Sequence, residues 1–181
     1  METVNDLTDW LAARGIDTSA WGTGAAKSVA DLWEELRGGD CTLADNPPRR
    51  EVAVVQITIR RGACVLLEIE QEMENGRFRA RNHLPSEKIK TGEALDSAAR
   101  RCLQEELAVA ETAVTWLPHT DPPYQQIADS PSYPGLLTNY TFYPVVAQVT
   151  GLPDGPFWRD NLAARTGDPV QRHLWAWRAA V

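Results

Sequence analysis

The stretch that decides the fold runs from residue 92 to residue 109 and reads Gly-Glu-Ala-Leu-Asp-Ser-Ala-Ala-Arg-Arg-Cys-Leu-Gln-Glu-Glu-Leu-Ala-Val. Its apolar residues recur every four positions, which is the spacing of one face of an α-helix. The residues on this face are Leu95, Ala99, Leu103 and Leu107. The pattern predicts a helix over residues 94–107 that turns this stripe toward a hydrophobic core.

The neighbouring face of the same helix carries acidic chemistry. Cys102, Glu105 and Glu106 are related by the i, i+3 and i+4 spacings, so their side chains converge, and Arg101 lies one turn before Glu105 and can pair with it. Adjacent carboxylates repel each other unless a cation compensates them. Magnesium takes oxygen ligands, usually one or two carboxylates together with substrate phosphates. The face therefore predicts a site for a divalent cation and a diphosphate, with a solvated acidic face as the alternative.

On both sides of this helix the hydrophobic period changes to that of β-strands. Strands are predicted over residues 52–59, 63–69, 77–81, 114–117, 137–149 and 173–178. Glu74-Asn75-Gly76 is typical of a hairpin turn, and residues 137–149 are predicted to be one long strand or a bent pair of strands divided at Pro144. Residues 118–135 and 151–169 are predicted to be loops. Strands around one central helix indicate a mixed α/β (α+β) layered domain.

The chain before residue 47 is predicted to be helical. One helix is expected over residues 3–14, and a second begins at the capping residue Ser28 and ends at Gly38-Gly39. Asn46-Pro47-Pro48 is interpreted as a linker. The predicted organisation is therefore an N-terminal helical extension over 1–46 and a second domain over 51–181.

The region around the central helix resembles the signature of the Nudix family. That signature is Gly, five residues, Glu, seven residues, Arg-Glu, an aliphatic residue, any residue, Glu-Glu, any residue, Gly and an aliphatic residue. The matching residues are Glu93, Arg101, Leu103, Glu105, Glu106 and Val109. The resemblance implies a Nudix-like mixed β-sheet sandwich around the motif helix. It also implies hydrolysis of a diphosphate bond in a nucleoside-diphosphate-linked substrate.

The resemblance further implies roles for individual residues. Glu105 and Glu106 would bind Mg²⁺ or Mn²⁺, Arg101 would orient the carboxylates, and Glu93 would support the site. In this family the general base comes from varied positions outside the motif. The candidates here are Glu68, Glu70 and Glu72.

Three positions depart from the signature. Glu87 and Ala108 stand where the motif has glycine, and Cys102 stands where the family has a metal-binding Glu. A thiol is poorly suited to Mg²⁺, and we interpret Cys102 as a small apolar replacement. The altered motif leaves two alternatives open. One is a Nudix-fold isomerase or cyclase that does not hydrolyse its substrate. The other is a catalytically weakened domain, with no metal, that binds a nucleotide or a protein and regulates.

Further residues are candidates for substrate binding. Arg77, Arg79 and Arg81 alternate along a predicted strand, so they share one face, and Lys88 follows in the motif loop. These cations predict an anion-binding patch, and a charged edge strand is the alternative. Tyr133 lies in the long loop and is available to stack on a substrate ring, with packing over the sheet as the alternative.

Composition limits the other possibilities. The 181 residues carry a net charge of −7, which argues against nucleic-acid binding through a basic surface. The three cysteines are odd in number and favour a reducing cytoplasm. No apolar run approaches the ~20 residues that a membrane helix needs. The expected partner is a small diphosphate-containing molecule. For the tryptophan-containing N-terminal arm, a dimer contact, a cover over the sheet and a lid over the pocket all stay open.

Overall fold

The computed structural model describes residues 2–162 and 169–180. It has a mixed α+β fold, as predicted, with three α-helices among these residues. The chain divides into two compact units, which we describe separately. The helical unit comprises residues 1–54, 88–93 and 123–142, and the sheet unit comprises residues 55–87, 94–122 and 143–181. The predicted domain boundary between residues 46 and 51 stays a prediction.

The two helices of the helical unit begin where their capping residues predict. In α1 (Val4–Ala13) the Thr3 side chain accepts a hydrogen bond from the Asp6 backbone N–H, and Asp6 reaches back to Thr3. Ser28 and Asp31 form the same reciprocal capping box in α2 (Val29–Arg37). Each box satisfies backbone donors that the first helical turn leaves without partners.

Two strand pairs complete the helical unit. Strand β1 (Thr42–Asp45) pairs antiparallel with the start of β2 (Pro48–Arg61), and β7 (Tyr124–Asp129) pairs antiparallel with the first half of β8 (Leu137–Val149). The two helices and these strands enclose a core, whose buried members include Leu7, Leu11, Trp21, Leu32, Cys41, Val52, Val54, Tyr133 and Leu136.

Two expectations for this part of the chain were wrong. Asn46-Pro47 is the turn of the β1–β2 hairpin, with Asp45 opposite Pro48, and does not form a linker. The predicted loop 118–135 contains β7, whose residues are mostly exposed. An edge strand of this kind is held by backbone pairing to β8 and shows no apolar alternation that a sequence pattern could detect.

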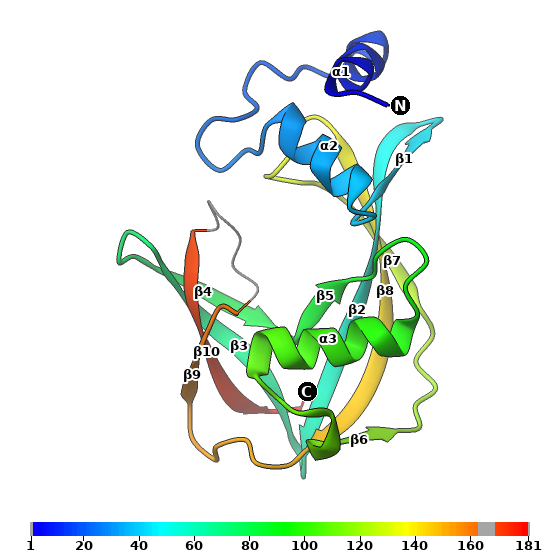
Figure 1. The fold of residues 1–181 in the computed structure, drawn as a ribbon. Coiled ribbons are helices and arrows are strands. Elements are labelled where there is room, and N and C mark those ends of the chain that lie inside the picture. Colours follow the sequence, from blue (N-terminus) through cyan, green and yellow to red (C-terminus); the bar gives the residue numbers. More distant parts are fainter. Residues whose placement is uncertain (1, 163–168, 181) are drawn as a thin grey trace. The chain divides into compact units, whose positions relative to one another are not determined.

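The sheet unit has the strand order β6-β8-β2-β3-β10-β9, and β4 pairs with β3 (Figure 1). The strands not yet bounded are β3 (Cys64–Met73), β4 (Phe78–His83), β5 (Ser86–Lys88), β6 (Val114–Leu117), β9 (Phe157–Asp160) and β10 (Val170–Ala179). Helix α3 (Leu95–Leu107) lies over this sheet, and the 3-10 helix η1 (Glu111–Ala113) follows it. The predicted central helix is thus confirmed to within one residue.

The strand predicted over 137–149 is confirmed as a single long strand, whereas the predicted loop 151–169 needs correction. Strand β8 is continuous through Pro144, because the proline lies between residue 142, the last to pair with β7, and residue 146, the first to pair with β6. Its missing N–H therefore costs no hydrogen bond along that edge. The predicted loop 151–169 contains β9, and residues 163–168 of that loop lie outside the described residues.

Strand β3 contains a bulge that sets which of its side chains are buried. Glu68 lies opposite Trp175 of β10 and Glu70 lies opposite Leu174, so Ile69 between them has no partner in β10. The extra residue shifts the alternation of the strand by one position. Glu68 and Gln71 consequently both lie on a buried side, with exposures of 5% and 6%.

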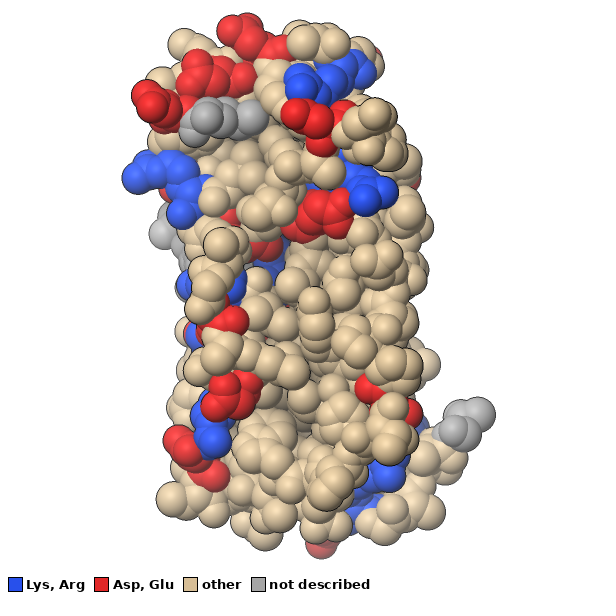
Figure 2. Space-filling model, turned by 90° about the vertical axis from the view of Figure 1, so that its right-hand side faces the viewer, with Lys and Arg blue, Asp and Glu red and all other residues tan. Residues whose placement is uncertain are grey.

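The described helices include none that is long and apolar enough to cross a membrane. On the face drawn in Figure 2, the blue Lys and Arg side chains lie next to the red Asp and Glu side chains and do not gather into one basic area.

Candidate functional site

Helix α3 is anchored in the sheet unit by buried side chains, some of which lie one turn from its carboxylates. Ala98, Cys102 and Leu107 are fully buried, and Ala99 and Leu103 are nearly so, whereas Leu95 at the first turn is exposed. The predicted apolar stripe therefore holds for three of its four members. The helix ends at Ala108, which adopts φ 54° and ψ 36° in the left-handed region where the signature has glycine.

Arg101 joins two carboxylates from different segments. Its Nη1 atom lies 3.4 Å from Glu105 Oε2, the predicted i, i+4 pair, and 3.4 Å from Glu87 Oε1. Glu87 belongs to β5, just after Pro85 has accepted a backbone hydrogen bond from Ile57 of β2. The residue that replaces the leading glycine of the motif therefore adds a carboxylate beside the α3 guanidinium.

Glu106 lies in an acidic and poorly hydrated environment. Its side chain is 20% exposed. Burial raises the pKa of Glu106 to about 7, and although His173 works against the shift, the carboxylates of Glu68, Glu87 and Glu105 add to it. Burial is thus the main reason that Glu106 favours its protonated form, and the three neighbouring carboxylates add to the effect.

His173 of β10 connects the buried part of β3 with α3. Its Nδ1 atom lies 2.6 Å from Glu68 Oε1 and 3.9 Å from Glu106 Oε2. Burial alone would raise the pKa of Glu68, yet hydrogen bonds from His173 and Arg81 lower it. Spacing along the chain gives no signal for His173, because it approaches Glu68 only through the pairing of β10 with β3.

Cys102 behaves as a small apolar residue. Its side chain is fully buried, and burial raises the pKa of its thiol well above the ordinary value. The nearby carboxylates of Glu106 and Glu87 raise this pKa further. A protonated, buried thiol offers no ligand to a hard cation, which agrees with its interpretation from the sequence.

Two of the three candidate arginines contact buried polar groups. Arg79 Nε donates a hydrogen bond to Gln71 Oε1 at 2.9 Å, and Arg81 Nε donates to Glu68 Oε2 at 3.1 Å. Arg77 precedes β4 and is exposed. The assignment of all three to substrate binding stays a prediction.

The remaining candidates lie in the helical unit and have partners within it. Glu93 Oε2 accepts a hydrogen bond from the Lys90 backbone N–H at 2.9 Å, and Lys88 Nζ lies 3.0 Å from Glu35 Oε2. Tyr133 is fully buried, with its ring centroid 5.1 Å from that of Trp21. The buried ring of Tyr133 fits the packing alternative, and its role in substrate binding stays a prediction.

The donor chemistry of the α3 cluster suits a hard cation. Glu87, Glu105 and Glu106 offer carboxylate oxygens, which Mg²⁺ and Mn²⁺ accept. Over residues 2–162 and 169–180, no group of three or more His, Cys, Asp or Glu side chains is arranged to hold a metal ion. The guanidinium of Arg101 is the cation that Glu87 and Glu105 share here.

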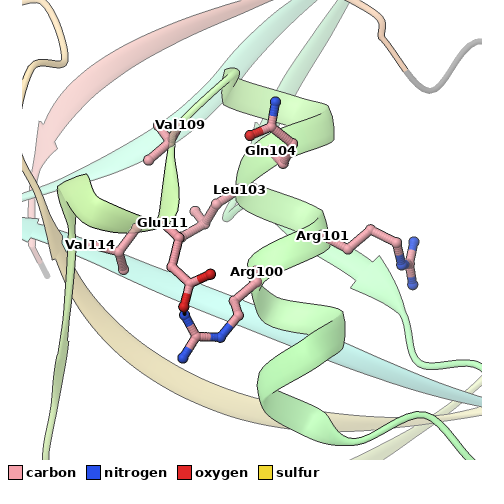
Figure 3. A pocket seen from close by; sticks show the side chains of 7 residues that line it. All are labelled: Arg100, Arg101, Leu103, Gln104, Val109, Glu111 and Val114. Atoms are coloured by element: carbon pink, nitrogen blue, oxygen red, sulfur yellow. Dashed lines mark hydrogen bonds and ion pairs between the residues drawn. The ribbon is translucent and has the colours of Figure 1, made fainter.

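A hollow of about 240 Å³ lies along α3 (Figure 3). Its lining residues are Arg100, Arg101, Leu103, Gln104, Val109, Glu111 and Val114. Arg100 pairs with Glu111 on one flank of the helix, while the guanidinium of Arg101 points away from that pair. None of Glu87, Glu105 and Glu106 lines the hollow. We place the candidate chemistry at the carboxylate cluster, which is Glu106 with Glu68, Glu87 and Glu105 around it, because its oxygen atoms suit a hard cation.

Comparison with protein families identifies the fold. The family model described as NUDIX domain matches residues 47–165, which is more than half of the chain. The chain belongs to the NUDIX domain family. The match includes α3 and the whole carboxylate cluster, and it ends before His173.

Solved structures of NUDIX proteins are similar to this chain at low identity. A NUDIX hydrolase from Nitrosomonas europaea is 19% identical, with 71% of this chain and 72% of that chain covered and a TM-score of 0.44. A MutT NUDIX hydrolase from Burkholderia pseudomallei is 20% identical, with coverage of 71% and 83% and a TM-score of 0.40. The Ap4A hydrolase binary complex of C. elegans is 19% identical, with coverage of 70% and 79% and a TM-score of 0.37. A comparison with curated proteins gave no match.

Proposed function

We propose that this NUDIX-domain protein hydrolyses a diphosphate bond in a small nucleoside-diphosphate-linked substrate, with Mg²⁺ or Mn²⁺ as the cofactor. The observation that carries the proposal is the charge around Glu106. A partly buried carboxylate that has three further carboxylates nearby, and a pKa raised to about 7, would be stabilised in its charged form by an added cation. A divalent cation supplies this positive charge.

Glu105 and Glu106 are the residues that would hold the metal. Arg101 fixes the rotamer of Glu105 through their ion pair at 3.4 Å. Glu87 lies on the same guanidinium and supplies oxygen atoms near the place where Cys102 has none to offer. A bound divalent ion polarises phosphoryl oxygen and lowers the pKa of bound water. In this proposal Glu93 holds the conformation of the preceding loop by accepting the Lys90 N–H.

Hydrolysis and metal binding can be tested together. Wild type, Glu106→Gln and Cys102→Glu are assayed against a panel of nucleotide diphosphates, each with Mg²⁺ and with Mn²⁺. Glu111→Gln is the matched control, because this glutamate pairs with Arg100 on the other flank of α3. Loss of activity in Glu106→Gln with a normal control supports hydrolysis. Equal activity in wild type and Glu106→Gln contradicts the proposed metal site.

One observation favours a second candidate function, a NUDIX-like domain that binds a nucleotide without hydrolysing it. Cys102 is fully buried where the signature has a carboxylate, which removes one of the family's metal-binding oxygens. If this candidate holds, wild type binds a nucleoside diphosphate by calorimetry and hydrolyses none of the panel, while Cys102→Glu gains activity. Turnover by wild type excludes it.

A further inference from the structure

We infer that His173, held by Glu68, is a positioning residue for the Glu106 carboxylate. The inference rests on the proposed function, because it assigns a role to two side chains outside the motif helix in preparing one of its metal-binding residues. It concerns three elements of the sheet unit: β3, which carries Glu68, β10, which carries His173, and α3, which carries Glu106.

The imidazole of His173 lies between the two carboxylates. One atom, Nδ1, is 2.6 Å from Glu68 Oε1 and 3.9 Å from Glu106 Oε2. The shorter distance is that of a strong hydrogen bond, and the longer one leaves Glu106 in electrostatic contact without a direct bond. Glu68 therefore fixes the ring, and the fixed ring limits the positions that the Glu106 carboxylate can occupy.

Glu68 is itself held at both oxygens. Gln71 Nε2 donates to Oε1 at 2.5 Å, and Arg81 Nε donates to Oε2 at 3.1 Å. Gln71 is in turn held by Arg79, whose Nε donates to the Gln71 amide oxygen at 2.9 Å. A carboxylate with both oxygens engaged cannot rotate freely, so the orientation of His173 is transmitted from the β3–β4 pair.

Burying the polar side chains of Glu68, Gln71 and His173 costs free energy, so stability alone does not explain their presence. Glu68, Gln71 and His173 are 5%, 6% and 6% exposed. Replacing a buried polar group by a well-packed apolar one is often neutral or stabilising, so such a cluster is weak evidence for stability. Its position beside Glu106 gives it a use, since the groups behind a metal ligand fix the ligand's orientation.

The test measures Mn²⁺ affinity by electron paramagnetic resonance as well as kcat and KM on the best substrate of the panel. His173→Phe removes the Nδ1 donor and is expected to lower Mn²⁺ affinity by about 10-fold or more, with a fall in kcat larger than any rise in KM. His173→Asn puts an amide N–H near the Nδ1 position and is expected to recover most of the loss. Glu68→Gln tests the other half of the pair.

Two comparisons make the outcome unambiguous. His119→Asn is the matched control, because His119 is an exposed histidine of the same unit, and it is expected to leave affinity and rate unchanged. Thermal melting identifies a variant that fails to fold, in which case the milder pair His173→Asn and Glu68→Gln decides. Unchanged Mn²⁺ affinity in His173→Phe, with affinity lost in Glu106→Gln, overturns the inference and leaves the proposed function. Unchanged affinity in Glu106→Gln overturns both.

Discussion

Glu35 of the helical unit is buried and Glu106 of the sheet unit is partly buried, and the charges around these two glutamates differ. Glu35 of the helical unit lies 2.7 Å from Lys27 Nζ and 3.0 Å from Lys88 Nζ, and it also pairs with the buried Arg50. Burial alone would raise its pKa, but these three cations lower it to about 2. Glu106 of the sheet unit lies among carboxylates, and its pKa is raised to about 7.

The difference is the basis on which we assign a structural role to Glu35 and, within the proposed function, a metal-binding role to Glu106. The charge of Glu35 is neutralised by cations of the chain itself. No ligand is therefore needed to stabilise this carboxylate in the interior of the helical unit. Glu106 is shielded from water beside three further carboxylates, so its charged form would be stabilised by an added cation. Strongly perturbed pKa values of the second kind are a physical marker of a binding or catalytic site.

The largest expected effect comes from breaking the ion pairs of Glu35 with Lys27, Arg50 and Lys88. Glu35→Gln leaves the buried Arg50 guanidinium without its carboxylate, and breaking a buried ion pair from one side costs roughly 3–5 kcal/mol in the free energy of unfolding. Urea unfolding checks the change. The pKa of Glu35 is depressed, so wild type should keep this contribution above about pH 4.5 and lose it as the pH falls toward about 2. A loss below about 1 kcal/mol would show that the cluster is not structural.

The same change at the other glutamate should affect chemistry. Glu106→Gln removes one of the two proposed metal ligands, and kcat/KM is expected to fall at least about 100-fold, which corresponds to about 2.7 kcal/mol. Steady-state kinetics with Mg²⁺ measures the effect, and Glu35→Gln, assayed while folded, should change kcat far less. An equal fall in both variants would erase the distinction between the two sites.

The contribution of Glu106 to stability should depend on pH in the sense opposite to that of Glu35, and Glu106→Gln should abolish that dependence. Its carboxylate has a folded pKa near 7 and an ordinary value of 4.5, so the folded state holds the extra proton between these values. Wild type therefore loses stability as the pH rises from about 4.5 to about 7, and the glutamine variant does not. We expect the variant to be more stable by roughly 1–3 kcal/mol at pH 8 and similar to wild type at pH 4, measured by thermal melting without metal. Saturating Mn²⁺ should stabilise wild type and close the gap.

The smallest expected effect concerns the C-terminal end of α3. It tests whether the backbone conformation at Ala108 lowers stability independently of the charges on the helix. Ala108 has a positive φ of 54°, a conformation that costs a residue with a Cβ about 1 kcal/mol relative to glycine. Ala108→Gly is expected to stabilise the protein by roughly 0.5–1 kcal/mol, with the same gain at pH 5 and pH 8. A gain that varies with pH would mean that the helix end and the Glu106 cluster are coupled.

Local patterns in the sequence were sufficient to predict where the helices lie. Ser28 with Asp31 predicts the start of α2, and the four-residue apolar period predicts α3 with the pairing of Arg101 and Glu105. Strands stabilised by backbone pairing at an edge, such as β7, carry no comparable pattern. Their existence depends on a neighbour far along the chain.

The candidate site was predictable only where it lies on α3. Glu68 was one of three equivalent candidates for the base, because regular alternation places Glu68, Glu70 and Glu72 together. The bulge separates them, and Glu72 pairs instead with Arg172, whose Nε lies 2.7 Å away. His173 reaches the site because β10 pairs with β3, which brings it to Glu68, 105 residues away in the chain. No local spacing in the sequence reveals this contact.

The unpaired Ile69 also protects β3 against slipping. If the strand were regular at this point, its alternation would turn Glu70 and Glu72 inward along with Glu68, and three acids would compete for the hydrogen bonds that now serve one. Burying carboxylates without partners costs several kcal/mol each, so the misaligned strand is far less stable than the native one. The bulge at Ile69 thus fixes the register of this acidic strand. A shifted register is disfavoured by the cost of burying carboxylates, even where apolar packing alone would allow it.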